Sequence, residues 1–204
     1  MKAILISIQP KWVEKIASGE KTIEVRKSLP NIERPFKCYI YCTKGKDLLR
    51  EVDWCNTRAG IHKTNYKIIN LDYCTNKIAN GKVIGEFVCD RIDDYIYKGT
   101  DNQLYWRYPD TRDVERVKKE SCLTIGEIID YIGDSDNCCF WHISDLVIYD
   151  KPKELCEFTP ICKVKGEWCD NCICYEETFG GCCRVLSRPP QSWCYVEDQE
   201  DERD

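Results

Sequence analysis

The sequence has no apolar run long enough to cross a membrane. None of its apolar stretches reaches the roughly 18 residues that a transmembrane helix needs, which excludes a helical membrane protein. The apolar start of the chain meets Gln9, Pro10 and Lys11 before it attains the roughly 7–15 residues of a secretory signal core, and no small-residue cleavage site follows. We therefore expect a cytoplasmic protein whose first segment is a buried strand.

Histidine is also scarce, because the chain has only His62 and His142. His142 falls in a segment with strand character, where a packed side chain is the more common role. We therefore do not expect a catalytic centre built on histidine.

Charge is unevenly distributed along the chain, although the net charge is only −5. Residues 1–50 carry 11 Lys and Arg against 5 Asp and Glu, whereas residues 151–204 carry 7 against 12. A basic N-terminal part within an acidic protein indicates one anionic ligand site rather than general polyanion binding. Any single charge among these is expected to lie on a solvated face.

Cysteine is abundant, with 16 residues divided evenly between the first 139 positions and the segment 156–194. The first group is mostly scattered among apolar residues, so these cysteines are expected to fill the core. An oxidised secreted scaffold would need a secretory signal, which the sequence does not show, and disulfides are rare in a reducing cytosol. The second group is clustered and is considered below.

Hydrophobic periodicity predicts several strands and two short helices. Helices are expected at residues 10–18, where Pro10 suits the first turn, and at 123–131, where Thr124 and Glu127 form a capping box. Residues 44–80 are expected to be an insertion of loops and short helices, and residues 93–119 to be irregular. Strands are expected at 3–8, 22–27, 37–43, 82–92 and 140–149.

The stretch "SGEKTIEVRK", residues 18–27, places three charged residues close together. Alternation puts Glu24 and Arg26 on one face of a strand, and Lys21 lies at the junction between helix and strand. Two interpretations remain open. In the first, the three form internal ion pairs; in the second, they line a cleft in which Arg26 and Lys21 meet a phosphate, a carboxylate or a base edge.

These residues also carry a family resemblance. The opening "ILISIQPKWVEKIASGEKTIEVRK", with the pattern G-x-K-x-x-E-x-R, resembles that of ASCH domains, which belong to the PUA-like superfamily of small β-barrels. The stretches "VIGEFVCDRI" and "FWHISDLVIYDKPKELCEF" are similar to ASCH strands in character and order. The resemblance covers about residues 1–157. It implies an α+β fold, a small PUA-like mixed β-barrel with short flanking helices, and a role in binding RNA or modified bases.

One branch of small bacterial ASCH proteins removes the acetyl group from N4-acetylcytidine with a Lys, a Thr and a Glu. The Lys of that branch matches Lys21, but its Thr nucleophile falls on Glu24, and a carboxylate does not replace an activated hydroxyl in that chemistry. Thr22 lies nearby on the strand, and Glu120 is a loose match for the family's Glu. The resemblance therefore implies a site more firmly than it implies this reaction.

Aromatic residues near the motif are candidates for stacking on a base. Trp12, Tyr41 and Trp141 lie in the elements closest to it, although each would more often be a core residue. Stacking of one base on such a ring contributes about 1–3 kcal/mol to binding.

The C-terminal cysteines have the spacing of a metal site. Cys169 and Cys172 form a C-x-x-C pair, Cys162 precedes it, and Cys182 and Cys183 follow it, with Cys174 in reserve. Four thiolates complete a tetrahedral metal site. A segment so poor in aliphatic residues buries little apolar surface, so it needs a cross-link of this kind to fold. We expect structural zinc, with an iron–sulfur cluster, disulfides or free thiols as alternatives.

The sequence thus predicts an ASCH/PUA-like domain at residues 1–150, a Cys-rich and metal-binding extension at 151–196, and a disordered acidic tail at 197–204. Residues 193–195 are expected to add an edge strand to the barrel. The expected function, for a protein of bacterial or phage type, is binding of RNA or a nucleotide-like ligand around Lys21, Glu24 and Arg26. Alternatives are a hydrolase acting on a modified nucleoside or RNA from the same cleft, and a protein-interaction module in phage–host conflict.

Overall fold

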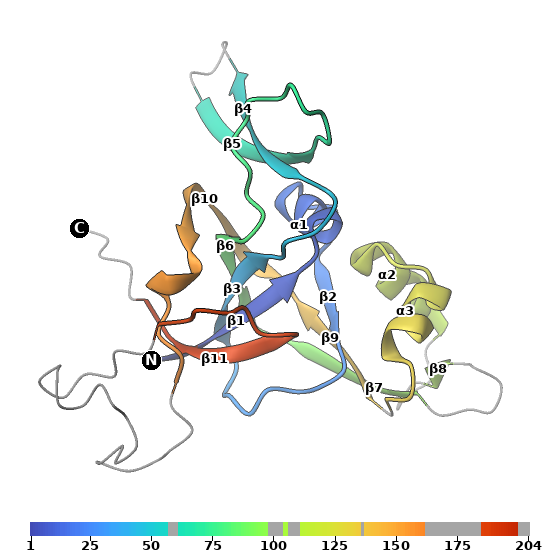
Figure 1. Cartoon of the computed structure of the whole chain (residues 1–204). Helices are drawn as coiled ribbons and strands as arrows, with labels where there is room; N and C mark the ends of the chain where they lie inside the picture. Colours follow the sequence, from blue (N-terminus) through green and yellow to red (C-terminus); the bar gives the residue numbers. More distant parts are fainter. Residues whose placement is uncertain (57–60, 98–103, 106–110, 136, 162–184, 200–204) are drawn as a thin grey trace, which may run out of the picture.

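The apolar first segment lies inside the larger sheet of the protein (Figure 1). The computed structural model describes residues 1–56, 61–97, 104–105, 111–135, 137–161 and 185–199. The sheet has five strands, in the order β10 (Ser144–Glu154), β6 (Lys82–Cys89), β3 (Phe36–Cys42), β1 (Lys2–Ile8) and β11 (Trp193–Glu197). β1 runs parallel to β3, and the other neighbours are antiparallel. Because β1 has a neighbour on each side and buried residues on both faces, it forms part of the core.

A second, antiparallel sheet carries the charged motif. Its four strands follow the order β2 (Ile23–Arg26), β9 (Asn137–His142), β7 (Ile92–Tyr97) and β8 (Leu104–Tyr105). The prediction of a single strand at 140–149 is wrong. This segment is divided at Ile143 into β9 and β10, which belong to different sheets. The alternating pattern there is continuous, so the sequence hides the change of sheet.

Two of the three α-helices in the described residues agree with their sequence signals. α1 (Pro10–Ala17) begins at its proline and buries Val13 and Ile16. α3 (Ile125–Ile132) begins with the expected capping box between Thr124 and Glu127. The irregular segment expected at 93–119 is wrong in part, because β7 opens it and α2 (Thr111–Ser121) closes it.

The insertion at 44–80 is a β-hairpin rather than loops and short helices. β4 (Leu49–Asn56) and β5 (Ile61–Ile68) pair antiparallel and project at the top of Figure 1. Tyr66 and Leu49 anchor the base of the hairpin in the core. Arg50 supports it by donating hydrogen bonds to the carbonyl oxygens of Ile69 and Asn76, both at 2.9 Å.

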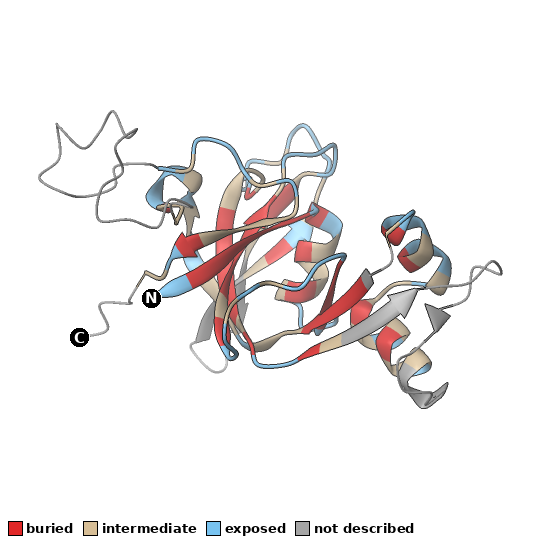
Figure 2. Cartoon of the chain, turned by 90° about the horizontal axis from the view of Figure 1, so that it is seen from below, coloured by how far each residue is buried: buried red, intermediate tan, exposed pale blue. Residues whose placement is uncertain are grey.

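The main core lies on one face of the five-stranded sheet, and Figure 2 shows it as a band of buried residues along the strands. α1 and the inner side of β9 pack against it through Val13, Ile16 and Trp141. A second cluster joins Ile23 and Val25 of β2 to α2 and α3. The α+β class expected from the sequence is confirmed, with strands that alternate between two covered sheets.

The C-terminal strand returns to the body of the protein. β11 pairs antiparallel with β1, which confirms the edge strand expected around residues 193–195. The boundary of the disordered tail is wrong by three residues, because Glu197 ends β11 and the next two residues are hydrogen-bonded. Tyr39 Oη donates to Asp198 Oδ1 at 2.7 Å and accepts from the Gln199 amide at 2.8 Å. Among the described residues, no helix is both long and apolar enough to span a bilayer.

Candidate functional site

The charged motif begins where α1 ends. Gly19 has φ of +80°, a left-handed conformation that suits glycine after a helix, and it turns the chain toward β2. Ile23 and Val25 pack toward α2 and α3, so Glu24 and Arg26 share the other face of the strand. The sequence prediction of that shared face is confirmed.

Lys21, Glu24 and Arg26 form a buried ion-pair network. Glu24 Oε1 lies 3.0 Å from Arg26 Nη2, and Glu24 Oε2 lies 3.3 Å from Lys21 Nζ. The exposed fractions of the three residues are 2%, 6% and 5%, in chain order. The interpretation as internal ion pairs is therefore confirmed. It does not exclude a ligand site, because the same three residues line a cavity.

Backbone carbonyls from distant segments hold the two cations in place. Lys21 Nζ donates to the carbonyl oxygen of Ser121 at 2.8 Å, and Arg26 Nη2 donates to that of Ser7 at 2.8 Å. Arg26 Nη1 reaches Ser192 Oγ at 3.4 Å. The network thus joins β1, β2, the end of α2 and the segment before β11. Its position is set by the fold and needs no ligand to be ordered.

Two buried polar atoms of the network have no hydrogen-bond partner among the described residues. Glu24 Oε2 contacts Lys21 as an ion pair but accepts no hydrogen bond, and Arg26 Nε donates none. An unsatisfied buried polar atom costs about 1–3 kcal/mol, so proteins seldom retain one without a use. The first atom is a hydrogen-bond acceptor and the second is a donor.

The cavity beside the network has a volume of about 440 Å³. Trp12 of α1 and Tyr131 of α3 contribute aromatic rings to its lining, and Lys21 Nζ lies 5.4 Å from the centre of the Trp12 ring. Further polar residues of the lining come from β1, the start of α1, the end of β3, α3 and the chain before β11: Ser7, Gln9, Lys11, Thr43, Glu127, Asp130 and Gln191. A cavity of this size holds one small organic molecule.

Burial changes the protonation of Lys21. Removal from water lowers its pKa below 10.5, and the negative charge of Glu24 opposes that change. The nearby charge of Arg26 lowers it further. Lys21 is therefore a cation that gives up its proton more easily than a surface lysine.

The other residues predicted for the site are only partly brought together. Trp12 lines the cavity, whereas Tyr41 lies in a core cluster on the opposite face of the five-stranded sheet. Trp141 pairs with Glu24 across β2 and β9, but its ring is fully buried against Phe36 and Trp193. Tyr41 and Trp141 are therefore wrong as stacking candidates. Tyr41 belongs to the other core cluster, and the ring of Trp141, although it shares a strand face with Glu24, is held in the main core.

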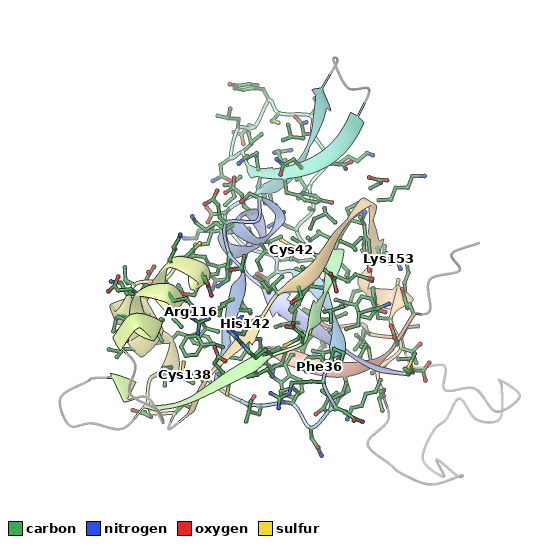
Figure 3. The ribbon with its side chains drawn as sticks, turned by 180° about the vertical axis from the view of Figure 1, so that it is seen from behind. Phe36, Cys42, Arg116, Cys138, His142 and Lys153 are labelled. Carbon is green, nitrogen blue, oxygen red and sulfur yellow. The ribbon has the colours of Figure 1, made fainter. Side chains whose placement is uncertain are left out.

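Thr22 and Glu120 line a second cavity, of about 690 Å³, instead of the first. Here Asp93 Oδ2 contacts His142 Nε2 at 2.9 Å and Arg116 Nη2 at 3.0 Å. Figure 3 shows Arg116 and His142 side by side, between α2 and β9. The expectation that His142 is a packed residue fits its 15% side-chain exposure. No sequence pattern indicated this cluster, because the pairing of β7 with β9 and the packing of α2 bring its members together.

The carboxylate of Asp93 stays ionised in this cluster. Burial alone would raise its pKa, but hydrogen bonds from His142 and Arg116 and the charges of His142 and Arg91 outweigh that effect. The pKa of Asp93 is lowered to about 2. Arg116 also contacts Glu120 at 3.2 Å, so the cations of this cavity are largely neutralised by carboxylates.

The predicted metal ligands Cys162, Cys169, Cys172, Cys182 and Cys183 lie outside the described residues, as does Cys174. Within the described ranges, no group of three or more His, Cys, Asp or Glu side chains has the arrangement of a metal site. Several scattered cysteines are buried, as expected of core residues: Cys38, Cys42, Cys89, Cys138 and Cys139.

No family model and no curated protein matches the chain. A search of solved structures found the ASCH protein of Zymomonas mobilis, at a TM-score of 0.46 and 17% identity over 96% of this chain and 87% of that chain. One single-site variant of that protein aligns at a TM-score of 0.49 and 16% identity, over 96% and 88% of the two chains. Another single-site variant aligns at a TM-score of 0.45 and 16% identity, over 76% of this chain and 77% of that chain. All three structures are of an ASCH protein, and the ASCH family is the one whose opening motif this sequence resembles.

Proposed function

We propose that the cavity around Lys21, Glu24 and Arg26 binds a single base of RNA or a nucleotide-like ligand. The observation that carries this proposal is the pair of buried atoms, Glu24 Oε2 and Arg26 Nε, at a cavity that also contains two aromatic rings. A nucleobase presents a hydrogen-bond donor next to an acceptor on its edge, and a flat face on each side.

The two atoms match such an edge. Glu24 Oε2 accepts a hydrogen bond from an amino or imino group of the base, and Arg26 Nε donates one to a neighbouring ring nitrogen or carbonyl oxygen. A site built in this way rejects a ligand that lacks the edge, because the buried groups are then left unpaired. Trp12 and Tyr131 supply ring faces, and stacking of one base contributes about 1–3 kcal/mol.

The size of the cavity favours an unstacked base. About 440 Å³ accommodates one nucleoside but not a base pair, so the recognised nucleotide comes from a single strand, a loop or solution. Much of the wall comes from β1, β2, α1 and α3, and the segments that join the elements add the rest, including Thr43 and Gln191. The base therefore meets a preformed site, which reduces the entropic cost of binding.

Binding experiments with two complementary variants test this proposal. We expect the four nucleosides or short single-stranded RNA oligomers to bind at modest salt, as measured by calorimetry and fluorescence anisotropy. Arg26→Lys and Trp12→Leu should each weaken binding about tenfold or more, since each removes about 1–3 kcal/mol of recognition. Lys118→Gln, on the exposed side of α2, is the matched control and should bind as the wild type does. If neither nucleosides nor RNA bind the wild-type protein, the proposal is wrong.

A second candidate is hydrolysis of a modified nucleoside or of RNA in the same cavity. The lowered pKa of Lys21, which lies 3.3 Å from Glu24, favours it, because a lysine that gives up its proton more easily than a surface lysine is better suited to acid–base chemistry. Turnover of a bound ligand that is abolished by Lys21→Ala, with binding retained, would support the enzyme. Binding without turnover of any tested nucleoside or RNA would support the binding protein.

We also propose that the Cys-rich segment holds structural zinc through Cys162, Cys169, Cys172 and either Cys182 or Cys183. The spacing of these thiols supports the proposal, and an iron–sulfur cluster would use the same ligands. Metal analysis of the purified protein should find about one equivalent of zinc, which Cys169→Ser should remove. Less than about half an equivalent of zinc or iron would contradict a metal site of this kind.

A further inference from the structure

The chain just before β11 is held against the end of β1. The amide of Ser7 donates a hydrogen bond to the carbonyl oxygen of Ser192 at 2.9 Å, and Ser7 Oγ donates one to that of Pro190 at 2.7 Å. Ser7 is itself buried in the sheet. Because one buried serine holds the residues on both sides of Gln191, the backbone at Gln191 is fixed beside β1, and its side chain lines the cavity.

A second glutamine follows the strand that holds the first. Gln9 comes directly after β1 and is the N-cap of α1, where its side chain makes no capping hydrogen bond. Gln9 and Gln191 are both exposed and both line the cavity, and neither side-chain amide has a hydrogen-bond partner among the residues that the structure describes. Two neutral amides, each with two N–H donors and an acceptor oxygen, thus lie unpaired at the opening of the cavity.

Arg26 relates the two glutamines to the buried end of the cavity. Its guanidinium donates a hydrogen bond to the carbonyl oxygen of Ser7 and reaches Ser192 Oγ. Gln191 directly precedes Ser192 in the chain. Gln9 lies two residues beyond Ser7, which is about 7 Å of extended chain. Exposure rises along that path, from 6% at Ser7 to an exposed side chain at Gln9, so the glutamines lie between the buried guanidinium and solvent.

We propose that Gln9 and Gln191 bind the ribose hydroxyls of the ligand, so that the site selects ribonucleotides over deoxyribonucleotides. This inference rests on the proposed function and adds a ligand class to it. A base whose edge meets Glu24 and Arg26 carries its sugar toward the opening of the cavity, where the two amides lie. A ribose hydroxyl both donates and accepts hydrogen bonds, and an amide offers the matching acceptor and donors.

The carboxylates that α3 contributes to the lining are less suited to this contact. Glu127 Oε2 already accepts hydrogen bonds from the Thr124 amide at 2.9 Å and from Thr124 Oγ1 at 3.0 Å. Asp130 belongs to the same helix, and α3 supplies none of the described residues that hold Arg26. The sugar of a base held by Arg26 therefore meets the glutamines rather than α3.

Affinities for ribonucleosides and for the matching 2′-deoxyribonucleosides test this inference. Loss of one neutral hydrogen bond lowers affinity about 3- to 10-fold. In calorimetry, the wild-type protein should therefore bind each ribonucleoside about 3- to 10-fold more tightly than its 2′-deoxy counterpart. Gln9→Met and Gln191→Met keep the length of the side chain and remove its amide. The double variant should bind the two nucleosides with equal affinity, and its unfolding midpoint should equal that of the wild type.

Two further variants are controls for the ratio of the two affinities. Arg188→Met changes an exposed side chain of the same segment that does not line the cavity, so the ratio should stay at the wild-type value. Trp12→Leu removes a stacking face for the base and no contact with the sugar. It should weaken binding of both nucleosides by the same factor and leave the ratio unchanged.

Three outcomes would overturn this inference while the proposed function stands. The first is equal affinity of the wild-type protein for ribonucleosides and 2′-deoxyribonucleosides. The second is a ribose preference that persists in the double glutamine variant, including one that Asp130→Asn abolishes instead. The third is an equal loss of affinity for both nucleosides in that variant, which would place the amides on the base. If no nucleoside and no RNA oligomer binds, the proposed function itself fails, and this inference fails with it.

Discussion

Replacing Glu24 with Gln tests whether the ion-pair network is a structural centre of the protein. The carboxylate has two cationic partners, at 3.0 and 3.3 Å, and all three residues are almost fully buried. Removing one member of such a network leaves uncompensated buried charge and costs about 3–5 kcal/mol. For a chain of this length, that corresponds to a fall in the melting temperature of about 6–20 °C.

The effect should depend on pH, because Lys21 can lose its proton. Its pKa in the folded protein is lowered from 10.5, so the unfolded chain binds this proton more tightly than the folded protein does. Stability therefore rises with pH between the folded pKa and the ordinary value. In Glu24→Gln the opposing charge of Glu24 is absent, so the pKa of Lys21 falls further and the rise should begin at a lower pH.

The assay is thermal and urea unfolding of both proteins at several pH values between neutral and alkaline. Glu20→Gln is the control, because Glu20 belongs to the same stretch and pairs with Lys15 at the surface. It should leave the unfolding midpoint unchanged. A loss below about 1 kcal/mol for Glu24→Gln at neutral pH would refute the reasoning, since it would place the network among surface ion pairs.

Two further predictions concern other parts of the molecule. Asp93→Asn should cost about 1–2 kcal/mol at neutral pH, because the pKa of about 2 adds stability above pH 4 that is lost as the pH falls toward 2. The variant should therefore lose less stability on acidification than the wild type, and an identical acid profile in urea unfolding would contradict this. Tyr39→Phe should release Asp198 and Gln199, with a loss of about 1–2 kcal/mol and faster hydrogen exchange at the Gln199 amide. An unchanged rate of hydrogen exchange at the Gln199 amide would contradict the role of Tyr39 in holding these two residues.

The local features of the fold could be predicted where one residue type decides the structure. Pro10 marked the start of α1, Thr124 with Glu127 marked that of α3, and alternation in β2 placed Glu24 and Arg26 on one face. Each of these signals acts within a few residues. None of them depends on the path of the rest of the chain.

The errors occurred where tertiary contacts decide the structure. β4 and β5 lacked a clean apolar alternation, and only the base of their hairpin enters the core, through Leu49 and Tyr66. α2 was missed because its sequence is rich in charge, and Val117 is its main buried apolar residue. In both cases pairing or packing with distant segments supplies the stability that the local pattern does not show.

The site divides in the same way. Its charged residues and Trp12 were predicted because they are neighbours in sequence, whereas Tyr131, Asp130 and Gln191 reach the cavity only through the arrangement of elements. Tyr41 was wrong because strand alternation was known but the identity of the core face was not. The sequence pattern thus predicted the charged residues of the cavity, whereas the residues that α3 and the chain before β11 contribute depend on the topology.

The return of β11 to the sheet has a consequence for the segment that precedes it. Ile161 donates from its amide to the Tyr195 carbonyl at 3.1 Å, and Leu186 to that of Phe158 at 3.0 Å, so both ends of segment 162–184 are joined to the same body. Fixing both ends costs chain entropy when the sheet forms, and this cost rises by only about 0.6 kcal/mol for each doubling of the number of residues between the ends. Insertions or deletions in this segment should leave the register of β11 on β1 intact, and with it Ser192 beside Arg26.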